Sequence, residues 1–317
     1  MLNAAWTVLC LFLLFFLPGF LVLAAIRAFT AGRGPLERFL LCVLVSLLAV
    51  SLLALLLAVN GVYSTPRLLL LLSLLSLVLL PAWIVRGLPP VFEFRECRNL
   101  RAPALILLPA AILFCRPHEY IAGGWDPGVY LQTGASVATQ GGVIYEDGEY
   151  AKLDAEAGEA LSRPFGLLSQ RFPGFRLVDS ATGTTCPQFY HLYPCLLAPL
   201  FDLGGVRAML FLNPCLALLA LLMVYRAGTA VFDRETGLAA SLLLACNVIQ
   251  IWFARFSTSE ILVQFLTWSG IWLLALDLRH DRRGYGALGA AALGAAAFAH
   301  ISSLLLLGPV ALFLFLT

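Results

Sequence analysis

The stretch 37-ERFLLCVLVSLLAVSLLALLLAVN-60 decides the fold. Its residues 39–59 carry no charge and are long enough for one α-helix to cross the hydrocarbon core of a bilayer, which takes about 20 residues. The whole chain has the same character, because 61% of its 317 residues are hydrophobic and only 12% are charged. Soluble domains carry about a quarter charged residues. No water-soluble fold of this length buries so much apolar surface, so we expect the chain to lie in lipid.

Outward from this stretch, apolar runs between charged residues and Gly/Pro breaks predict an all-α polytopic membrane protein with about nine transmembrane helices. The first run lacks the basic start and the small-residue cleavage site of a signal peptide, so it is interpreted as a span. The last two runs form either a tight hairpin or one broken helix. The predicted spans are 3–26, 37–60, 67–86, 101–115, 207–227, 236–253, 258–278, 284–299 and 302–317.

The distribution of basic residues predicts the topology, because short cytoplasmic loops are enriched in Lys and Arg. The loops after the first, third, fifth and seventh spans hold twelve of the 20 basic residues. The opposite short loops hold only Arg67 and Arg255. We therefore expect the N-terminus and the long segment 116–206 to lie outside. The twelve residues are Arg27, Arg33, Arg38, Arg86, Arg95, Arg98, Arg101, Arg226, Arg234, Arg279, Arg282 and Arg283.

The segment 116–206 is the one large hydrophilic part of the chain and holds ten of its 18 acidic residues. Asp126 followed by Pro127 predicts the N-cap and first residue of a short interfacial helix that ends at Gly141. Residues 143–186 are rich in turn formers and charge, which predicts a small irregular subdomain. Residues 189–203 turn apolar again, and we expect a half-helix that dips into the membrane there.

Composition excludes several classes of protein. The formal net charge of +2 gives no reason to expect a nucleic-acid partner. The eight cysteines show no metal-ligand spacing, and a disulfide between Cys186 and Cys195 stays open. The sequence has no P-loop, GxSxG, HExxH or dinucleotide fingerprint, which makes a nucleotide-driven pump a poor interpretation of this chain.

Four places in the sequence are candidates for chemistry, and each has a purely structural alternative. Asp126, after Trp125 in GGWDPGVY, either serves a ligand or only caps a helix. His191, between Tyr190 and Tyr193, either contacts a lipid phosphate or belongs to an aromatic belt.

Arg255 with Glu260, in a loop on the side that avoids basic residues, either binds phosphate or is a snorkelling pair. His300, at the end of a predicted span, is a functional candidate by default. The acidic run that contains Glu146 is typical of a solvated face.

The order of these motifs resembles the GT-C superfamily of membrane glycosyltransferases, which includes the protein O-mannosyltransferases and the bacterial aminoarabinose transferases. The resemblance lies in Asp126-Pro127-Gly128-Val129-Tyr130, in Gly142-Val143-Ile144-Tyr145, in His191-Leu192-Tyr193-Pro194, and in Arg255 with Glu260. Pro127 replaces the second acid of the family's usual pair, and His191 stands where many relatives have Lys.

The resemblance covers about residue 101 to the C-terminus. It implies an N-terminal three-span module (1–100) and a GT-C-like core (101–317) that is incomplete at its C-terminus.

The resemblance implies an inverting glycosyltransferase in the bacterial inner membrane. Such an enzyme would move a sugar from a polyprenyl-phosphate donor to a glycan, lipid or protein acceptor at the outer face. Asp126 would act as general base, with His191 and Arg255 on the donor phosphate. A divalent metal stays open. The pocket would be shaped by Trp125, Tyr130, Tyr145, Glu146, Tyr193, Glu260 and His300.

Two other classes remain as alternatives. A transporter or flippase of lipid-linked sugars would need ionisable residues in mid-membrane or an inverted repeat, and neither is evident. A non-catalytic assembly subunit would use the 116–206 segment only to bind partners. An enzyme needs Asp126, His191 and Arg255 to converge, whereas a scaffold does not.

Overall fold

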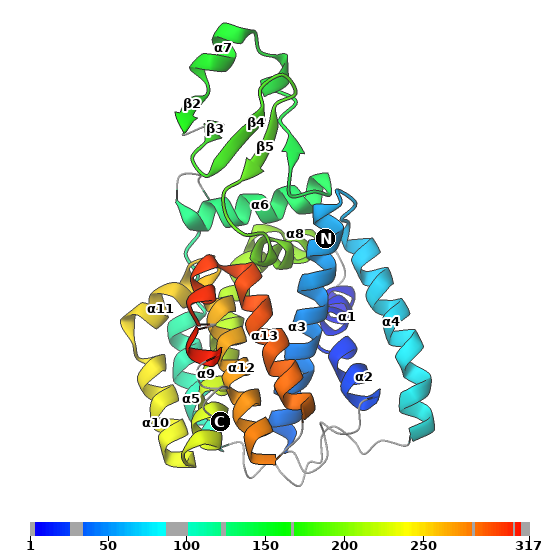
Figure 1. Ribbon diagram of the computed structural model, residues 1–317, viewed down its shortest axis with the longest axis vertical. Helices are drawn as coiled ribbons and strands as arrows, with labels where there is room; N and C mark the ends of the chain where they lie inside the picture. The colour runs from blue at the N-terminus through cyan, green and yellow to red at the C-terminus, as the bar shows by residue number, and fades with distance from the viewer. Residues whose placement is uncertain are drawn as a thin grey trace.

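A computed structural model describes residues 4–25, 34–86, 101–121, 125–165, 168–280, 283–306 and 308–311. It has a helical body and a small head that stands on one end of that body (Figure 1). By length and composition, five helices of the described part are apolar enough to cross a membrane. The chain is therefore built as a multi-pass membrane protein, and the end of the body that carries the head is called the head end below.

The five candidate spans match five of the predicted ones. Helices α1 (Ala4–Phe15) and α2 (Leu17–Ala25) together make the first. The others are α3 (Pro35–Val59), α4 (Thr65–Arg86), α9 (Leu212–Val231) and α12 (Glu260–His280).

The count of nine spans is not confirmed. Helices α10 (Arg234–Ala245) and α11 (Val248–Arg255) make a sixth span only if taken together, and they are bent by 65°. The bend follows from Asn247, whose side chain accepts hydrogen bonds from the next backbone amides and so starts a new helix. Helices α5 (Arg101–Phe114) and α13 (Arg283–Ala299) are apolar but shorter than 18 residues.

The last predicted span, 302–317, is only partly described. It begins in a 3₁₀ helix, η4 (Ile301–Leu306), and residues 312–317 lie outside the described residues. The predicted boundary between 1–100 and 101–317 follows the undescribed residues 87–100, so the division into two modules stays a prediction.

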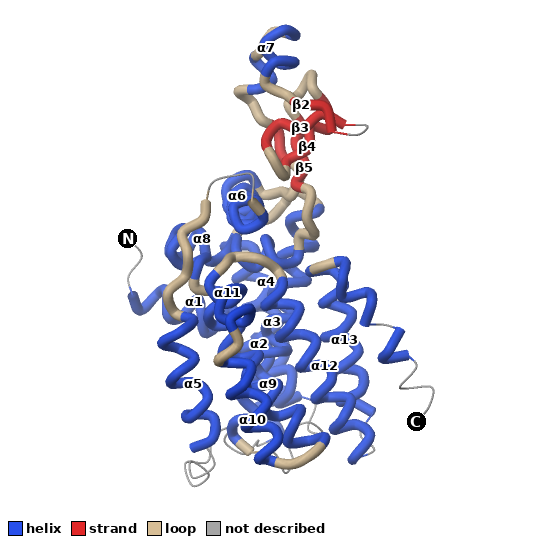
Figure 2. Tube along the Cα trace, turned by 90° about the vertical axis from the view of Figure 1, so that its left-hand side faces the viewer, coloured by secondary structure: helices blue, strands red, loops and turns tan. Residues whose placement is uncertain are grey.

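Helix α9 packs against α5, α10, α11 and α12, while α13 covers α12 on the other side (Figures 1 and 2). Glycine residues let the helices of this body approach each other closely. The backbones of α9 and α10 meet at Gly228 and Gly237, where a Cβ on Gly228 would lie 2.7 Å from the Gly237 Cα. Small residues let helices pack this tightly in lipid, where apolar burial alone does not drive association.

Connections that were predicted to share one side of the membrane do gather at the head end. The amide of Tyr63, after α3, donates to Gly141 O at 2.9 Å, and His118 N, after α5, donates to Arg255 O at 2.9 Å. At the opposite end an ion pair joins Glu37 of α3 to Arg226 of α9. Which end faces the cell exterior stays a prediction.

Helix α6 (Asp126–Gln140) lies across the head end, above α8 (Leu192–Leu210) (Figure 1). Gly141 ends α6 with φ of 81°, as its sequence position predicts. The prediction that Asp126 is the N-cap was wrong by one residue, because Trp125 takes that place and Asp126 begins the helix. The expected half-helix is found as the buried first part of α8, which breaks at Gly204 and Gly205.

The head is a five-stranded antiparallel sheet of order β1-β5-β4-β3-β2. The expectations of an all-α fold and of an irregular subdomain over 143–186 were therefore wrong. A strand is favoured over an irregular segment because its side chains point to alternate faces. In β4, Phe175 and Leu177 are buried, Arg176 between them is half-buried, and the two residues after them are exposed. The strands are β1 (Tyr145–Glu146), β2 (Arg163–Phe165), β3 (Leu168–Phe172), β4 (Phe175–Asp179) and β5 (Thr184–Pro187).

Asp147 ties the head together. Its carboxylate accepts from Arg171 Nε at 2.9 Å and from the amides of Glu149 and Tyr150. Burial of the carboxyl would raise its pKa, but these hydrogen bonds and the guanidinium outweigh burial and lower it.

We expect Gly237→Ala to lower the melting temperature of the detergent-solubilised protein by several degrees. The new Cβ would lie 2.5 Å from Tyr225 O, and such overpacking costs about 1–3 kcal/mol, more than the gain in helix propensity of about 0.5–1 kcal/mol. Gly294→Ala on α13 is the matched control, because no atom lies within 4 Å of its new Cβ. Equal melting temperatures for the two variants would contradict the tight α9–α10 contact.

We expect the backbone amides of the head to lose protection from hydrogen exchange at low pH. A carboxyl with a lowered folded pKa stabilises the folded state above its unfolded pKa of about 4, and that contribution disappears as pH falls through the folded value. The protection factors of the β3 and β4 amides, which correct for the slower intrinsic exchange in acid, should therefore fall at low pH in the wild type. Asp147→Asn should exchange faster already at neutral pH. Glu149→Gln, which removes only an exposed pair with Lys152, should behave as wild type.

Candidate functional site

The polar residues of the head end gather around Tyr130, the second-turn residue of α6. Its ring is buried, stacks on Phe189 at 4.9 Å and meets Tyr193 of α8 edge-on at 5.4 Å. Its hydroxyl shares a hydrogen bond of 2.9 Å with Ser259 Oγ, in the link between α11 and α12. Three segments far apart in sequence therefore meet at one phenol.

Two carboxylates act on the Tyr130 hydroxyl. Burial raises the pKa of this phenol, and the negative charges of Glu260 and Asp126 raise it further. Tyr130 therefore stays protonated at neutral pH. Asp126 lies one helical turn before Tyr130, and Glu260 directly follows Ser259, so the hydrogen bond between Tyr130 and Ser259 brings both acids to this part of the head end. A pocket that they share stays a prediction.

Asp126 is exposed at the start of α6. Trp125 beside it is also exposed, and its ring meets that of Tyr120 at 6.2 Å. An exposed carboxylate at a helix start, next to buried hydroxyls, is open to a substrate.

Glu260 begins α12, and its Oε2 atom is buried without a hydrogen bond in the described part of the chain. The Tyr193 hydroxyl is wholly buried beside the hydroxyl of Ser257, and neither makes a hydrogen bond of good geometry. Burial raises the pKa of Tyr193, as does the charge of Glu260. Buried polar atoms normally have partners, so these vacant donors and acceptors mark a site for water or ligand.

The link 256–259 is held in place from α9. Asn213, which is 1% exposed, donates from Nδ2 to the carbonyl oxygens of Phe256 and Thr258, the latter at 2.9 Å. This link bears Ser259 and leads into Glu260. Asn213 therefore positions the wall that faces Tyr130.

His191 lies between the two rings that touch Tyr130, but it faces another space. It lines an apolar cavity of 500 Å³, together with Leu55 and Val59 of α3 and Ala297 and Phe298 of α13. Burial lowers the pKa of the imidazole, and its Nδ1 has no hydrogen bond. At neutral pH the ring is therefore mainly uncharged.

Arg255 and Glu260 do not form the predicted pair in the described residues. Arg255 instead donates from Nε to Arg116 O at 2.7 Å, and its carbonyl accepts from His118 N. The His118 ring lies 4.9 Å from that of Phe256. The arginine thus fixes the segment after α5 to the end of α11 and keeps its terminal nitrogens for another partner.

The remaining predicted residues stand apart from Tyr130. Tyr145 and Glu146 form strand β1 and pair with Thr185 and Thr184 of β5, so they belong to the head sheet. His300 ends α13, where its Nδ1 lies 2.7 Å from Ser302 Oγ.

None of the described cavities is lined by Asp126, His191 and Arg255 together, so the convergence expected of an enzyme is not observed in them. The described residues contain no group of three or more His, Cys, Asp or Glu side chains that would hold a metal ion. Cys186 and Cys195 are both free.

Sequence reasoning missed Ser259 and Asn213. The run Ser257-Thr258-Ser259 between two apolar helices was a signal, and so was an amide inside an apolar span. Comparison with protein-family models, with curated proteins and with solved structures finds no match for this chain. The resemblance to the GT-C superfamily therefore rests on the motifs alone.

We expect Asn213→Ala to loosen the link without unfolding the body. Two buried carbonyls would lose their donor, at a cost of about 1–3 kcal/mol. Amide hydrogen exchange at Ser257–Glu260 should accelerate while that of α3 stays unchanged. Asn60→Ala, at an exposed helix end, should leave the link as in wild type. Unaltered exchange at 257–260 in Asn213→Ala would show that Asn213 does not hold the link in place.

Proposed function

We propose that this protein is an integral membrane glycosyltransferase that moves a sugar from a polyprenyl-phosphate donor to an acceptor hydroxyl. The observation that carries the proposal is the hydrogen bond between Tyr130 and Ser259, which joins the helix that starts with Asp126 to the helix that starts with Glu260 at the head end of a multi-pass body. A donor anchored in lipid and an acceptor in water reach each other only at such a boundary. The motif order that resembles the GT-C superfamily supports the same function.

In the proposed reaction, Asp126 takes the proton from the acceptor hydroxyl as the oxygen of that hydroxyl attacks the anomeric carbon of the sugar. The new bond to the acceptor forms while the bond to the phosphate oxygen breaks, so the lipid phosphate leaves with its electron pair and the sugar inverts. A general base must be accessible, and Asp126 at an exposed helix start fulfils this condition. Tyr130 would hold the site together through Ser259, and Glu260 would orient sugar hydroxyls beside Asp126.

The donor would bind on the His191 side. The 500 Å³ cavity below this residue is walled by apolar side chains of α3 and α13, which suits a prenyl tail. A phosphate next to His191 would favour the charged imidazolium, because an opposite charge offsets the effect of burial. The free guanidinium nitrogens of Arg255 would serve the same phosphate if substrate binding draws the segments together. We propose that the head end faces outward from the bacterial inner membrane.

We expect Asp126→Asn to lower sugar transfer by about 10²–10⁴-fold, which is the usual effect of losing a general base. Asparagine keeps the shape of the side chain but cannot take a proton. The assay incubates purified protein with candidate polyprenyl-phosphate sugars and measures the lipid phosphate released. Glu156→Gln, an exposed change on α7 of the head, is the matched control and should transfer at the wild-type rate. Near-normal turnover in Asp126→Asn would sink the proposal.

A further inference from the structure

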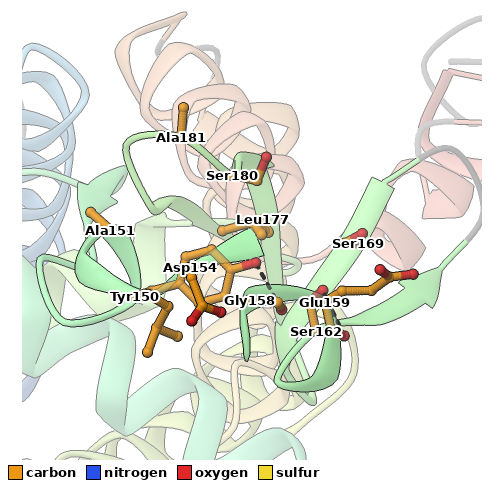
Figure 3. Close-up of a pocket in the computed structure, with 11 residues that line it drawn as sticks. Tyr150, Ala151, Asp154, Gly158, Glu159, Ser162, Ser169, Leu177, Ser180 and Ala181 are labelled. Atoms are coloured by element: carbon orange, nitrogen blue, oxygen red, sulfur yellow. Dashed lines mark hydrogen bonds between the residues drawn. The ribbon is translucent and has the colours of Figure 1, made fainter. Parts of the chain in front are cut away.

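The head contains a cavity of 440 Å³ that none of the chemistry above uses (Figure 3). One wall is formed by η3 (Tyr150–Lys152) and α7 (Ala155–Ala160), and the other by β3, β4 and the turn after β4. It lies in the outer part of the head, away from α6 and the helical body (Figure 1). Its volume is within the range of small-molecule sites, which is about 300–1,000 Å³.

The floor of the cavity is rigid. Tyr150 is 4% exposed, and its hydroxyl donates to Gly158 O at 3.1 Å, the bond drawn in Figure 3. The Arg171 guanidinium covers its ring at 5.1 Å from the centroid. Leu177 of β4, also buried, completes the floor. A preformed cavity of this kind does not have to be ordered by its ligand, which favours binding.

The polar groups of the lining are carboxylates and hydroxyls. Asp154 uses one oxygen to cap α7, through the amide of Ala157, and keeps the other free. The carboxylate of Glu159 makes no hydrogen bond in the described part of the chain, although its backbone carbonyl accepts from Ser162. The remaining side chains that bring polar atoms to the rim are those of Ser162, Ser169 and Ser180. None of the described lining residues is Lys, Arg or His.

This lining selects by charge. Two carboxylates in a lining whose described residues include no Lys, Arg or His disfavour phosphates, sulfates and uronic acids. They accept hydrogen bonds from hydroxyl groups, while the serine hydroxyls both donate and accept. A neutral sugar presents this complement of paired donors and acceptors over a compact shape. A basic peptide would pair its cations with the carboxylates, and the binding test below distinguishes it from a neutral sugar.

We propose that the head cavity binds one or two units of a neutral, polyhydroxylated glycan. The cavity lies away from α6, so we assign it to binding of the acceptor and not to the reacting centre. This role rests on the proposed function. The cavity would hold the distal part of a glycan acceptor while the reactive end reaches Asp126. The substrate class that follows is a neutral glycan chain rather than a single sugar, a phosphorylated glycan or a peptide.

The test measures binding alone, so it uses the full-length Asp126→Asn variant, in which no transfer complicates the reading. The protein is held in a detergent without a sugar headgroup, because maltoside or glucoside micelles would compete. Saturation-transfer NMR and titration calorimetry compare neutral tri- and tetrasaccharides of glucose, mannose and galactose with an oligouronate and a lysine-rich tripeptide. We expect at least one neutral oligosaccharide to bind, and the oligouronate to bind at least about tenfold more weakly.

Two variants place the binding in this cavity. Glu159→Gln leaves the described hydrogen bonds of the head intact and should weaken the neutral glycan by about tenfold, since a hydrogen bond to a charged group is lost. Ala181→Trp fills the space and should abolish binding. Ala160→Trp, exposed on α7 but outside the lining, is the control and should bind as the parent does.

Several results would overturn the proposal. These are no binding of any neutral oligosaccharide, tighter binding of the oligouronate or the peptide, and an Ala181→Trp variant that binds normally. Failure of the proposed function gives a different pattern. In that case the neutral glycan still binds at the head, while wild-type protein releases no lipid phosphate from any donor.

Discussion

The hydrogen bond between Tyr130 and Ser259 joins residues that are 129 positions apart, and the arrangement of the head end depends on it. One partner lies on α6, which rests across the top of the body. The other lies in the short link between α11 and α12, which Asn213 holds from within the bundle. Because both partners are buried, neither hydroxyl has water as an alternative, and separating them would leave two unsatisfied groups. The contact therefore fixes where Asp126 and Glu260 stand relative to each other.

The same constraint explains why chemistry is confined to this end. An apolar body in lipid satisfies its backbone within helices and cannot hold many polar side chains. Where α11 stops and α12 starts, the chain leaves the helical pattern at Phe256–Ser259, and its polar groups need partners from other elements. Asn213 and Tyr130 provide some of them. The unpaired atoms of Ser257 and Glu260 remain, and they give the boundary its capacity to bind a polar ligand.

Composition and periodicity predicted the long spans, the position of α6 and the buried start of α8, because apolar length, the Gly141 stop and the aromatic re-entry are local signals. They failed over 143–186. There the β4 stretch FRLVD alternates only over its first three positions, with Phe175 and Leu177 buried, and the charges around it hide that pattern. The pairing of Asp147 with Arg171, 24 residues away, is also invisible to local reasoning. The candidate site was likewise predicted only in part. Asp126, Tyr130, Tyr193 and Glu260 do gather, but Arg255 turns to Arg116 because its partner is a backbone carbonyl that no motif reveals.

The cavity beside His191 and the cavity in the head would take their ligands from different phases. The space beside His191 is walled by spans and is apolar, so a group that enters it comes from the lipid side. The space beside Glu159 is walled by the head and is polar and acidic, so its ligand comes from water. Asp126 and Tyr130 lie at the base of the head, where it joins the body. Under the proposed function, the exposed Asp126 on α6 would act between a donor that enters from lipid and an acceptor that enters from water. A scaffold has no need to keep the two cavities apart, and a transporter would have to connect them.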